Sequence, residues 1–345
     1  MKIVEGPYLR DLLDQPAALR GTLASLSEEP ELLSLVSHLH SGKLRRIVLT
    51  GMGSSYHALY PLHLVLTANR HCSLWVETSE LIHYLTEALG PETLVVALSQ
   101  SGESAETLGL LQICRGKVPL IAVTNNPASR LANQASVRIL MHAGLELGVS
   151  CKTYLASLLL LEWLSCILTG QDRAIARKDL ATAASMVELY LQPWERNVAA
   201  LRQMVVGVRQ VFIAGRGPSL AAAGTGGLIL KESARFSAEG MSSAAFRHGP
   251  IESVDNSVLV VVMEGDRRSE ILNRRLARDV HAAGGRTALV EMHDTPGPFH
   301  IPTAVERIRP ILEILPVQML SLALAALTGN EPGTFKLATK ITTTE

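Results

Sequence analysis

A short glycine–serine turn that occurs twice constrains the fold of this chain more than any other sequence feature. GMGSS (Gly51–Ser55) follows the apolar run Arg46–Thr50, and GRGPS (Gly215–Ser219) follows Val211–Ala214. The two copies start 164 residues apart, which is about the length of one domain. Each copy joins a predicted buried strand to a predicted helix. A repeat of this kind predicts two α/β domains related by an internal duplication.

The apolar pattern around both turns predicts the same alternation of strands and helices. Short Val/Ile/Leu runs, typical of buried parallel strands, are separated by helical stretches such as Ser219–Phe236 and Ser269–Ala283. The expected strands are Arg46–Thr50, Leu94–Leu98, Leu120–Thr124 and Val137–Met141 in the first half, and Val211–Ala214, Val258–Met263 and Thr287–Glu291 in the second. We therefore predict an α/β fold with two doubly wound parallel sheets. The expected domains are residues 1–170 and 171–330, followed by a tail, residues 331–345.

Charge and cysteine content argue against several classes of protein. Lys plus Arg and Asp plus Glu both total 32, so the formal net charge is zero and the chain has no field to hold a nucleic acid. The four cysteines form no CxxC pair, which argues against a thiolate zinc site and favours a reducing compartment. The apolar stretch Tyr154–Leu168 contains Glu162 and is short for a membrane span, so we expect a buried core helix. We expect a cytoplasmic protein with no membrane partner, no metal and no cofactor.

Two polar turns follow predicted strands and are typical of a phosphate site. GMGSSYHA places backbone N–H groups and the hydroxyls of Ser54 and Ser55 at a helix N-terminus, where phosphate binds favourably. LSQSGESAET (Leu98–Thr107) adds further hydroxyls around Gly102, and we expect Ser104 to cap the helix that follows. The second turn contains no Lys or Arg, which suits a phosphate monoester held by neutral donors. Both turns should face one pocket, because ligands of open parallel sheets bind beyond the carboxyl ends of the strands.

Six separated segments resemble the isomerase half of glucosamine-6-phosphate synthase, in the same order along the chain. They are GMGSSYHA, SQSGESAET, ELGVSCKTY (Glu146–Tyr154), LKE (Leu230–Glu232), FRHGP (Phe246–Pro250) and LATKITTTE (Leu337–Glu345). The chain thus resembles the tandem SIS-domain sugar isomerases over nearly its whole length. It shows no N-terminal glutaminase domain and no cysteine near residue 2, so glutamine is not the expected ammonia source. The resemblance is closer to stand-alone hexosamine-phosphate deaminases and to deglycases of phosphorylated fructosyl-amino acids.

The resemblance implies roles for individual residues. Glu232 corresponds to the general base that moves a proton between C1 and C2, and His248 to a ring-opening histidine supplied by the neighbouring subunit of a homodimer. Lys340 corresponds to a tail lysine that can form a Schiff base with an open-chain ketose. The expected substrate-binding residues are Ser54, Ser55, Ser99, Gln100, Ser101, Ser104 and Val149. The chemistry fits these residue types, because proton transfer beside a carbonyl needs a carboxylate or imidazole near the α-carbon.

Two departures from the synthase pattern set this chain apart. Thr225 and Ile229 stand where the synthases have a glutamate and a lysine, on the helix face that also carries Glu232. The synthase proton relay is therefore not expected, and Glu232 is the only acid–base group from that helix. ELGVSCKTY is one residue shorter than its synthase counterpart, and the role of Lys152 stays open between helix structure and the site. We therefore do not expect a synthase.

Three functions stay open at this point. The first is an isomerising deaminase that converts glucosamine 6-phosphate to fructose 6-phosphate and ammonia. The second is a deglycase that cleaves a fructosamine 6-phosphate, for which Glu232 and His248 would also serve. The third is a sugar-phosphate sensor without turnover, which the presence of both these residues disfavours. In each case the expected partner is a phosphorylated hexose or hexosamine.

Overall fold

The computed structural model describes residues 4–337 and 339–344, which form two compact units, each with one parallel sheet. The first-sheet unit consists of residues 17–145, 153–181 and 339–344. The second-sheet unit consists of residues 4–16, 146–152 and 182–337. The units are therefore interleaved along the chain. The division at residues 170 and 330 stays a prediction of where the two copies of the duplication begin and end.

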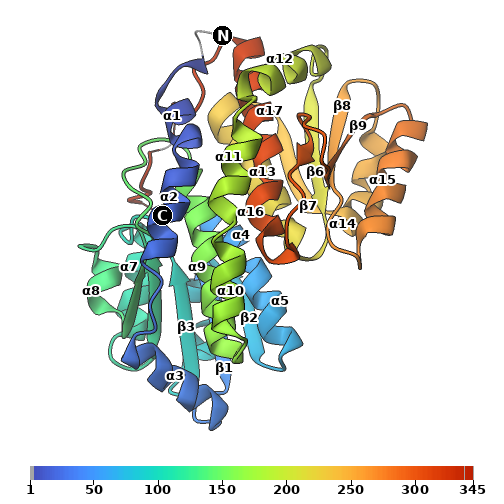
Figure 1. Ribbon diagram of the computed structural model, residues 1–345. Helices are drawn as coiled ribbons and strands as arrows, with labels where there is room; N and C mark the ends of the chain where they lie inside the picture. Colours follow the sequence, from blue (N-terminus) through green and yellow to red (C-terminus); the bar gives the residue numbers. More distant parts are fainter. Residues whose placement is uncertain (1–3, 338, 345) are drawn as a thin grey trace. The chain divides into compact units, whose positions relative to one another are not determined.

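The first sheet has five parallel strands, of which the central ones are fully covered. They are β1 (Arg46–Gly51), β2 (Cys72–Glu77), β3 (Thr93–Leu98), β4 (Leu120–Thr124) and β5 (Val137–Leu140). Their order across the sheet is β2-β1-β3-β4-β5, and β3 is the teal arrow in Figure 1. β3 and β4 are buried at every position. This explains their continuous apolar sequences, because a parallel sheet is covered on both faces.

The second sheet repeats the strand order of the first. Its strands are β6 (Gln210–Gly215), β7 (Ala238–Ser242), β8 (Val258–Met263), β9 (Arg286–Met292) and β10 (His300–Ile301). They are arranged as β10-β9-β8-β6-β7, all parallel. Numbered within its own unit, each sheet therefore has the order second, first, third, fourth, fifth. The predicted α/β fold is confirmed, and the shared order supports the predicted duplication.

Helices surround both sheets, as Figure 1 shows. In chain order they are α1 (Pro7–Leu13), α2 (Gln15–Ala24), α3 (Pro30–His40), α4 (Gly53–Ala58), α5 (Tyr60–Ala68), α6 (Thr78–Tyr84), α7 (Ala105–Cys114), α8 (Arg130–Gln134), α9 (Lys152–Thr169), α10 (Arg173–Leu180), α11 (Ala183–Leu191), α12 (Trp194–Met204), α13 (Leu220–Ala234), α14 (Ser243–Arg247), α15 (Glu270–Ala282), α16 (Arg309–Glu313) and α17 (Leu315–Thr328). Short 3-10 turns are η2 (Thr86–Ala88), η3 (Gly217–Ser219), η4 (Pro250–Ser253) and η5 (Glu306–Ile308). In the second-sheet unit, α13 packs on β6 and β7, while α15 packs on β8 and β9.

Two helical stretches are apolar and long enough to cross a membrane, but both are mostly buried. They are Lys152–Thr169, 89% buried, and Glu306–Thr328, 83% buried. A core helix has the same length and composition, so these stretches are weak evidence for a membrane span. The helix predicted at Tyr154–Leu168 lies within α9 and is confirmed as a core helix.

The sequence prediction missed three edge strands: β2 and β7, which occupy equivalent positions in the two sheets, and the two-residue strand β10. β2 is only partly covered, so its sequence, CSLWVE, is not a continuous apolar run. β7 has the sequence AEGMS, and glycine and glutamate are both depleted in strands. Edge strands lack the covered faces that give central strands their apolar signal.

Helix α13 lies very close to β7, and two glycines make this contact possible. A Cβ atom at Gly227 of α13 would overlap the backbone at Glu239 and Gly240. A Cβ atom at Gly240 of β7 would overlap the carbonyl oxygen of Ala223. Because Glu232 lies on the same helix, this contact also determines where the candidate base sits in its unit.

Candidate active site

Two glycines shape the turn after β1. Gly51 ends β1, and a Cβ atom there would lie 2.9 Å from the carbonyl oxygen of Leu98 in β3. Gly53 begins α4 with a φ of 52°, a left-handed value that favours glycine. Gly217 has the same conformation in the turn after β6, with a φ of 55°. Equivalent backbone geometry at the two turns explains why the GxGxS pattern occurs twice.

Backbone N–H groups in the loop after β3 orient the hydroxyl groups of its first two serines. Ser99 Oγ accepts a hydrogen bond from Gly102 N–H (3.1 Å), and Ser101 Oγ accepts one from Glu103 N–H (3.2 Å). A serine hydroxyl has one donor and two acceptor positions, so each keeps an O–H to donate. Among the described residues, no acceptor takes these two protons, and the Gln100 side-chain amide is also unpaired. The loop therefore presents oriented neutral donors.

The turn and the loop lie at the same edge of the first sheet. β1 and β3 are neighbours, with Gly51 opposite Leu98 at their carboxyl ends. The chain crosses from β1 to the edge strand β2 and then returns to β3 on the other side, so this is a topological switch point. Within the described part of the chain, the hydroxyls of Ser54 and Ser55 also lack hydrogen-bond partners. The structure thus brings the predicted phosphate-binding serines together.

An ion pair that the sequence analysis did not identify supports this loop. Gly102 has a φ of 65°, and a Cβ atom there would overlap the Ser129 side chain. Glu103 accepts hydrogen bonds from the Arg130 backbone N–H (2.5 Å) and from its Nε (2.7 Å). These bonds, the backbone one first, lower the pKa of the Glu103 carboxyl. Arg130 therefore offsets the one negative charge in the loop, which would otherwise repel an anion.

The C-terminal tail contacts the start of α7, beside the same loop. Ser104 Oγ accepts a hydrogen bond from Thr107 N–H (3.3 Å) and caps α7, so the predicted cap is confirmed. The Ala105 N–H at the first position of α7 donates to the carbonyl oxygen of Thr342 (3.0 Å). Lys340 is two residues from this contact and is half-buried. The tail lysine therefore belongs to a segment that contacts the start of α7, next to the hydroxyl-lined loop.

Glu232 lies near the end of α13 and is half-buried. Thr225 and Ile229 on the same helix are fully buried, so this part of α13 faces the interior of its unit. Tyr8, which the sequence analysis did not identify, is also buried and shares a hydrogen bond of 3.2 Å with Ser321 Oγ. Burial raises the pKa of Tyr8 well above its usual value, and the nearby Glu232 carboxylate raises it further. Glu232 thus sits beside a neutral phenol.

The remaining predicted residues have very different surroundings. His248 follows α14 and is exposed. Val149 is fully buried, so a sugar contact there would come from its backbone. Lys152 forms ion pairs with Asp11 (3.1 Å) and Asp14 (2.8 Å), which gives it a structural role at the start of α9.

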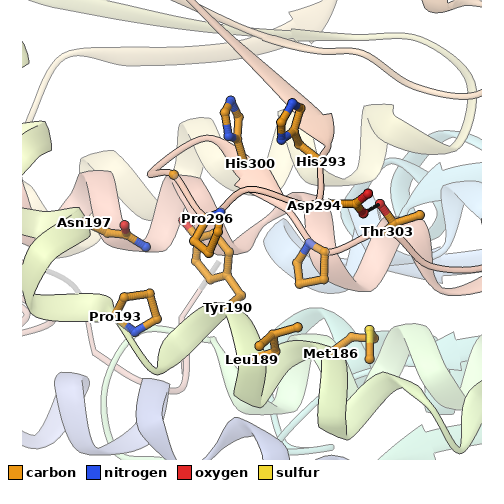
Figure 2. Close-up of a pocket in the computed structure, with 12 residues that line it drawn as sticks. Met186, Leu189, Tyr190, Pro193, Asn197, His293, Asp294, Pro296, His300 and Thr303 are labelled. Carbon is orange, nitrogen blue, oxygen red and sulfur yellow. Dashed lines mark hydrogen bonds between the residues drawn. The ribbon is translucent and has the colours of Figure 1, made fainter.

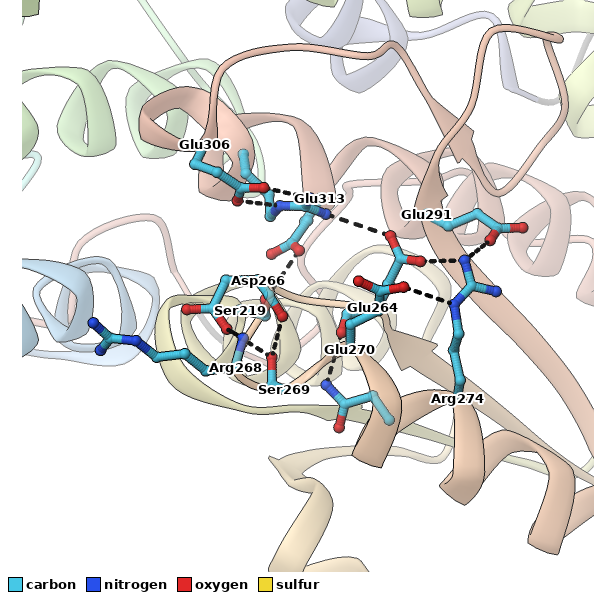
Figure 3. Close-up of polar contacts among 12 residues, drawn as sticks. Ser219, Glu264, Asp266, Arg268, Ser269, Glu270, Arg274, Glu291, Glu306 and Glu313 are labelled. Carbon is cyan, nitrogen blue, oxygen red and sulfur yellow. Dashed lines mark hydrogen bonds and ion pairs between the residues drawn. The ribbon is translucent and has the colours of Figure 1, made fainter.

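The equivalent edge of the second sheet is acidic. Glu264 and Asp266 follow β8 at the two positions where the loop after β3 has serines. Ser219, which ends the second GxGxS turn, donates a hydrogen bond to Glu313 Oε1 (2.9 Å), as Figure 3 shows. Side chains of the protein therefore fill this edge with carboxylates, and it is unsuited to phosphate.

Two arginines pair with the carboxylates of this acidic cluster, and one of them, Arg274, is labelled in Figure 3. Arg274 pairs with Glu264 and with Glu291, the latter at 2.7 Å. Arg309 pairs with Glu306 at 2.7 Å. Among the described residues that follow β1, β3, β6 and β8, the free serine hydroxyls noted above lie at the edge of the first sheet, whereas Ser219 in the second is bonded to Glu313.

Glu313 is expected to make stability depend on pH. Its carboxyl is fully buried, and burial raises its pKa from 4.5 to about 7. Because the pKa is raised in the folded state, the protonated Glu313 carboxyl contributes its full stabilisation below about pH 4.5. This contribution is lost as the pH rises through about 7. The total loss in the free energy of unfolding is on the order of 3 kcal/mol. In Glu313→Gln this loss should disappear. The difference in free energy of unfolding, wild type minus variant, should therefore fall across this range in urea titrations.

The control for this measurement is Glu31→Gln, an exposed position on α3 that should keep the wild-type pH profile. A constant difference between wild type and Glu313→Gln over the whole range would show that the carboxyl does not titrate as described.

Comparison with known protein families identifies the first-sheet architecture. The model of the SIS domain matches residues 42–165, a range that contains β1 to β5 and both hydroxyl-lined turns. Residues 42–165 of this chain form a SIS domain. The second sheet has the same strand order, so a tandem arrangement of two SIS folds is consistent with the structure.

Curated relatives match this chain over most of its length. Glutamine–fructose-6-phosphate aminotransferase [isomerizing] from Pyrococcus horikoshii is 29% identical over 341 residues, which cover 94% of this chain and 55% of the relative. The protein of the same name from Mycolicibacterium smegmatis is 26% identical over 347 residues, again 94% and 55%. The chain therefore spans about half the length of the curated relatives it matches.

Solved structures share the fold. The C-terminal domain of glucosamine-fructose-6-phosphate aminotransferase from Francisella tularensis has a TM-score of 0.83 at 24% identity and covers 95% of this chain and 98% of that one. Tagatose-6-phosphate ketose/aldose isomerase from Escherichia coli has a TM-score of 0.80 at 17% identity, with 96% of each chain covered. Glucosamine-6-phosphate deaminase from Thermotoga maritima has a TM-score of 0.77 at 16% identity, with 98% and 100% covered.

Proposed function

We propose that this protein is an isomerising deaminase that converts glucosamine 6-phosphate and water to fructose 6-phosphate and ammonia. The observation that carries the proposal is the loop after β3, whose oriented hydroxyls suit an uncharged cradle for a phosphate ester. The curated relatives are named as isomerizing aminotransferases of fructose 6-phosphate, which supports an amino-sugar phosphate as substrate.

In this proposal the phosphate is held by Ser54, Ser55, Ser99, Ser101 and Ser104, which donate to its oxygens. Neutral donors suit a substrate that must be released after each turnover, because hydrogen bonds between a neutral group and an anion are weaker than an ion pair with two charged partners. The N-terminus of α7 adds a favourable dipole for the anion. Binding of the C6 phosphate would thus fix the orientation of the open-chain sugar.

The chemical steps would fall to three residues. His248, proposed to act from the partner subunit of a homodimer, would protonate the ring oxygen and open the pyranose. Glu232 would take the proton from C2 and return it to C1, so that the C2 amine becomes an imine while the C1 aldehyde becomes an alcohol. Water would then add to the imine carbon, and the C–N bond would break to release ammonia and the C2 ketone. Lys340 would assist by attacking the C2 imine and displacing ammonia, and water would then hydrolyse the resulting Schiff base to the C2 ketone and free lysine.

The substrate is tested by supplying glucosamine 6-phosphate and fructosyl-lysine 6-phosphate separately and measuring ammonia, free lysine and fructose 6-phosphate. We expect ammonia and fructose 6-phosphate from the first substrate. Unphosphorylated glucosamine is the matched control and should react far more slowly, because it cannot use the serine cradle. Release of lysine from the second substrate alone would replace the deaminase by a deglycase. Binding of either ester without any product would leave a sensor and end the proposal.

A further inference from the structure

The second-sheet unit contains a cavity that the proposed mechanism does not use. It has a volume of about 260 Å³ and is formed by α11, α12 and residues 293–303, the segment after β9 that includes β10. Figure 2 shows its lining side chains, none of which is among the proposed catalytic or phosphate-binding residues. This volume suits a molecule of roughly ten non-hydrogen atoms.

The loop that covers the cavity is held in place by hydrogen bonds. Tyr190 Oη donates to the carbonyl oxygen of Pro298 (2.7 Å) and ties the loop to α11. Thr303 Oγ1 donates to Asp294 Oδ1 (2.8 Å) across the far side of the loop, as Figure 2 shows. The cavity is therefore preformed, which lowers the entropy cost of binding a ligand.

A buried side chain at the base of the cavity has unused hydrogen-bonding groups. Asn197 of α12 is only 2% exposed and lines the cavity. Across residues 4–337 and 339–344, no group hydrogen-bonds to its side-chain amide. Buried polar side chains are nearly always paired. The amide thus points to a ligand that carries a complementary polar group.

The rest of the lining indicates the chemistry of this ligand. Met186, Leu189 and Pro296 supply apolar walls, and the Tyr190 ring forms part of the floor. Asp294 is the only carboxylate among the lining residues that the structure describes, and no lysine or arginine is among them. A carboxylate and an aromatic face both attract a cation. The lining includes His293 and His300 but no Lys or Arg whose permanent charge would hold a phosphate.

We propose that this cavity binds a small organic cation with a flat apolar body, such as an arylalkyl amine. The ammonium group pairs with Asp294, the ring packs between the apolar walls, and a polar substituent of the ring meets the Asn197 amide. The site is separate in chemistry from the sugar-phosphate site, because it offers a carboxylate where that site offers hydroxyls.

Tyramine is a suitable probe because it carries a flat ring, a phenol and an ammonium group. Its matched control is 3-(4-hydroxyphenyl)propionate, which has the same ring and phenol but the opposite charge. At about pH 8, where the amine is still protonated, titration calorimetry of the whole protein should show saturable tyramine binding with a Kd near or below about 1 mM. The propionate should bind at least roughly tenfold more weakly.

Variants of the lining test the assignment of each group. Asp294→Asn keeps an oxygen that can accept from Thr303 and removes only the charge, so it should weaken tyramine binding by about tenfold. Leu189→Arg, at a position that is 49% exposed and safe for folding, should block binding by placing a cation at the wall. Glu195→Gln on α12 changes the same charge outside the lining and should bind like wild type.

Equal binding of tyramine and the propionate, or tyramine binding unchanged in both Asp294→Asn and Leu189→Arg, would overturn the proposal. The absence of saturable tyramine binding in the low millimolar range would do the same. Both variants change exposed side chains, so circular dichroism spectra that match wild type will establish that the comparison concerns the cavity and not folding.

Discussion

Replacing Glu232 by Gln is expected to lower kcat for glucosamine 6-phosphate by roughly 10²–10⁴-fold, the range that a positioned acid–base group contributes. The amide has the same shape as the carboxylate but cannot take the C2 proton. Phosphate contacts come from serines on other elements, so binding of fructose 6-phosphate, measured by calorimetry, should stay within about threefold of wild type. The result would separate loss of chemistry from loss of binding.

Glu239→Gln is the matched control for this experiment. Glu239 lies nearby in sequence, at β7, and forms an exposed ion pair with Lys231 at 3.7 Å. Exposed pairs contribute little, so kcat should be unchanged. Normal turnover by Glu232→Gln would remove Glu232 from the mechanism. Equal losses in both variants would point to a general effect of charge on this surface.

Gly240→Ala is expected to lower the free energy of unfolding by more than about 3 kcal/mol, the upper end of the usual cost of overpacking. The added methyl group would overlap the carbonyl oxygen of Ala223, which is backbone in the first turn of α13 and cannot rotate away. Either α13 must move off β7, or the strand must leave the sheet. Chemical denaturation followed by circular dichroism would measure the change.

Gly90→Ala is the control for this substitution. A Cβ atom at Gly90 meets no atom within 4 Å, so the free energy of unfolding should change by less than about 0.5 kcal/mol. If Gly240→Ala were as stable as wild type, α13 and β7 would not be packed as closely as described. If it folds with reduced stability, its kcat should also fall, because the helix that carries Glu232 would have shifted.

The central strands and the cap of α7 could be predicted because their signals lie in neighbouring residues. β3, β4 and β8 are buried along their whole length and read as unbroken apolar runs. Ser104 caps α7 through a hydrogen bond to a residue only three positions away. The edge strands β2 and β7 were missed because they are only partly covered, which removes the apolar pattern.

Part of the candidate site was also accessible from sequence, while its supports were not. The serine loops were identified from their hydroxyls and from their positions after strands. The hydrogen bond from Ala105 to Thr342 joins residues 237 positions apart, and no local sequence pattern predicts it. Tyr8 beside Glu232 is a similar case, since the N-terminal segment has no motif that links it to α13.

The amino-acid sequence by itself determined the alternation of strands and helices, the two glycine turns and the hydroxyl-rich loop. These features depend on backbone sterics and on contacts between residues close in sequence, so a short segment of the sequence is enough to predict them. Only the tertiary structure decided that the first sheet keeps free hydroxyls while Glu313 fills the matching edge of the second. That difference depends on which distant segment packs against each turn, and burial then determines whether a polar group is paired, charged or left for a ligand.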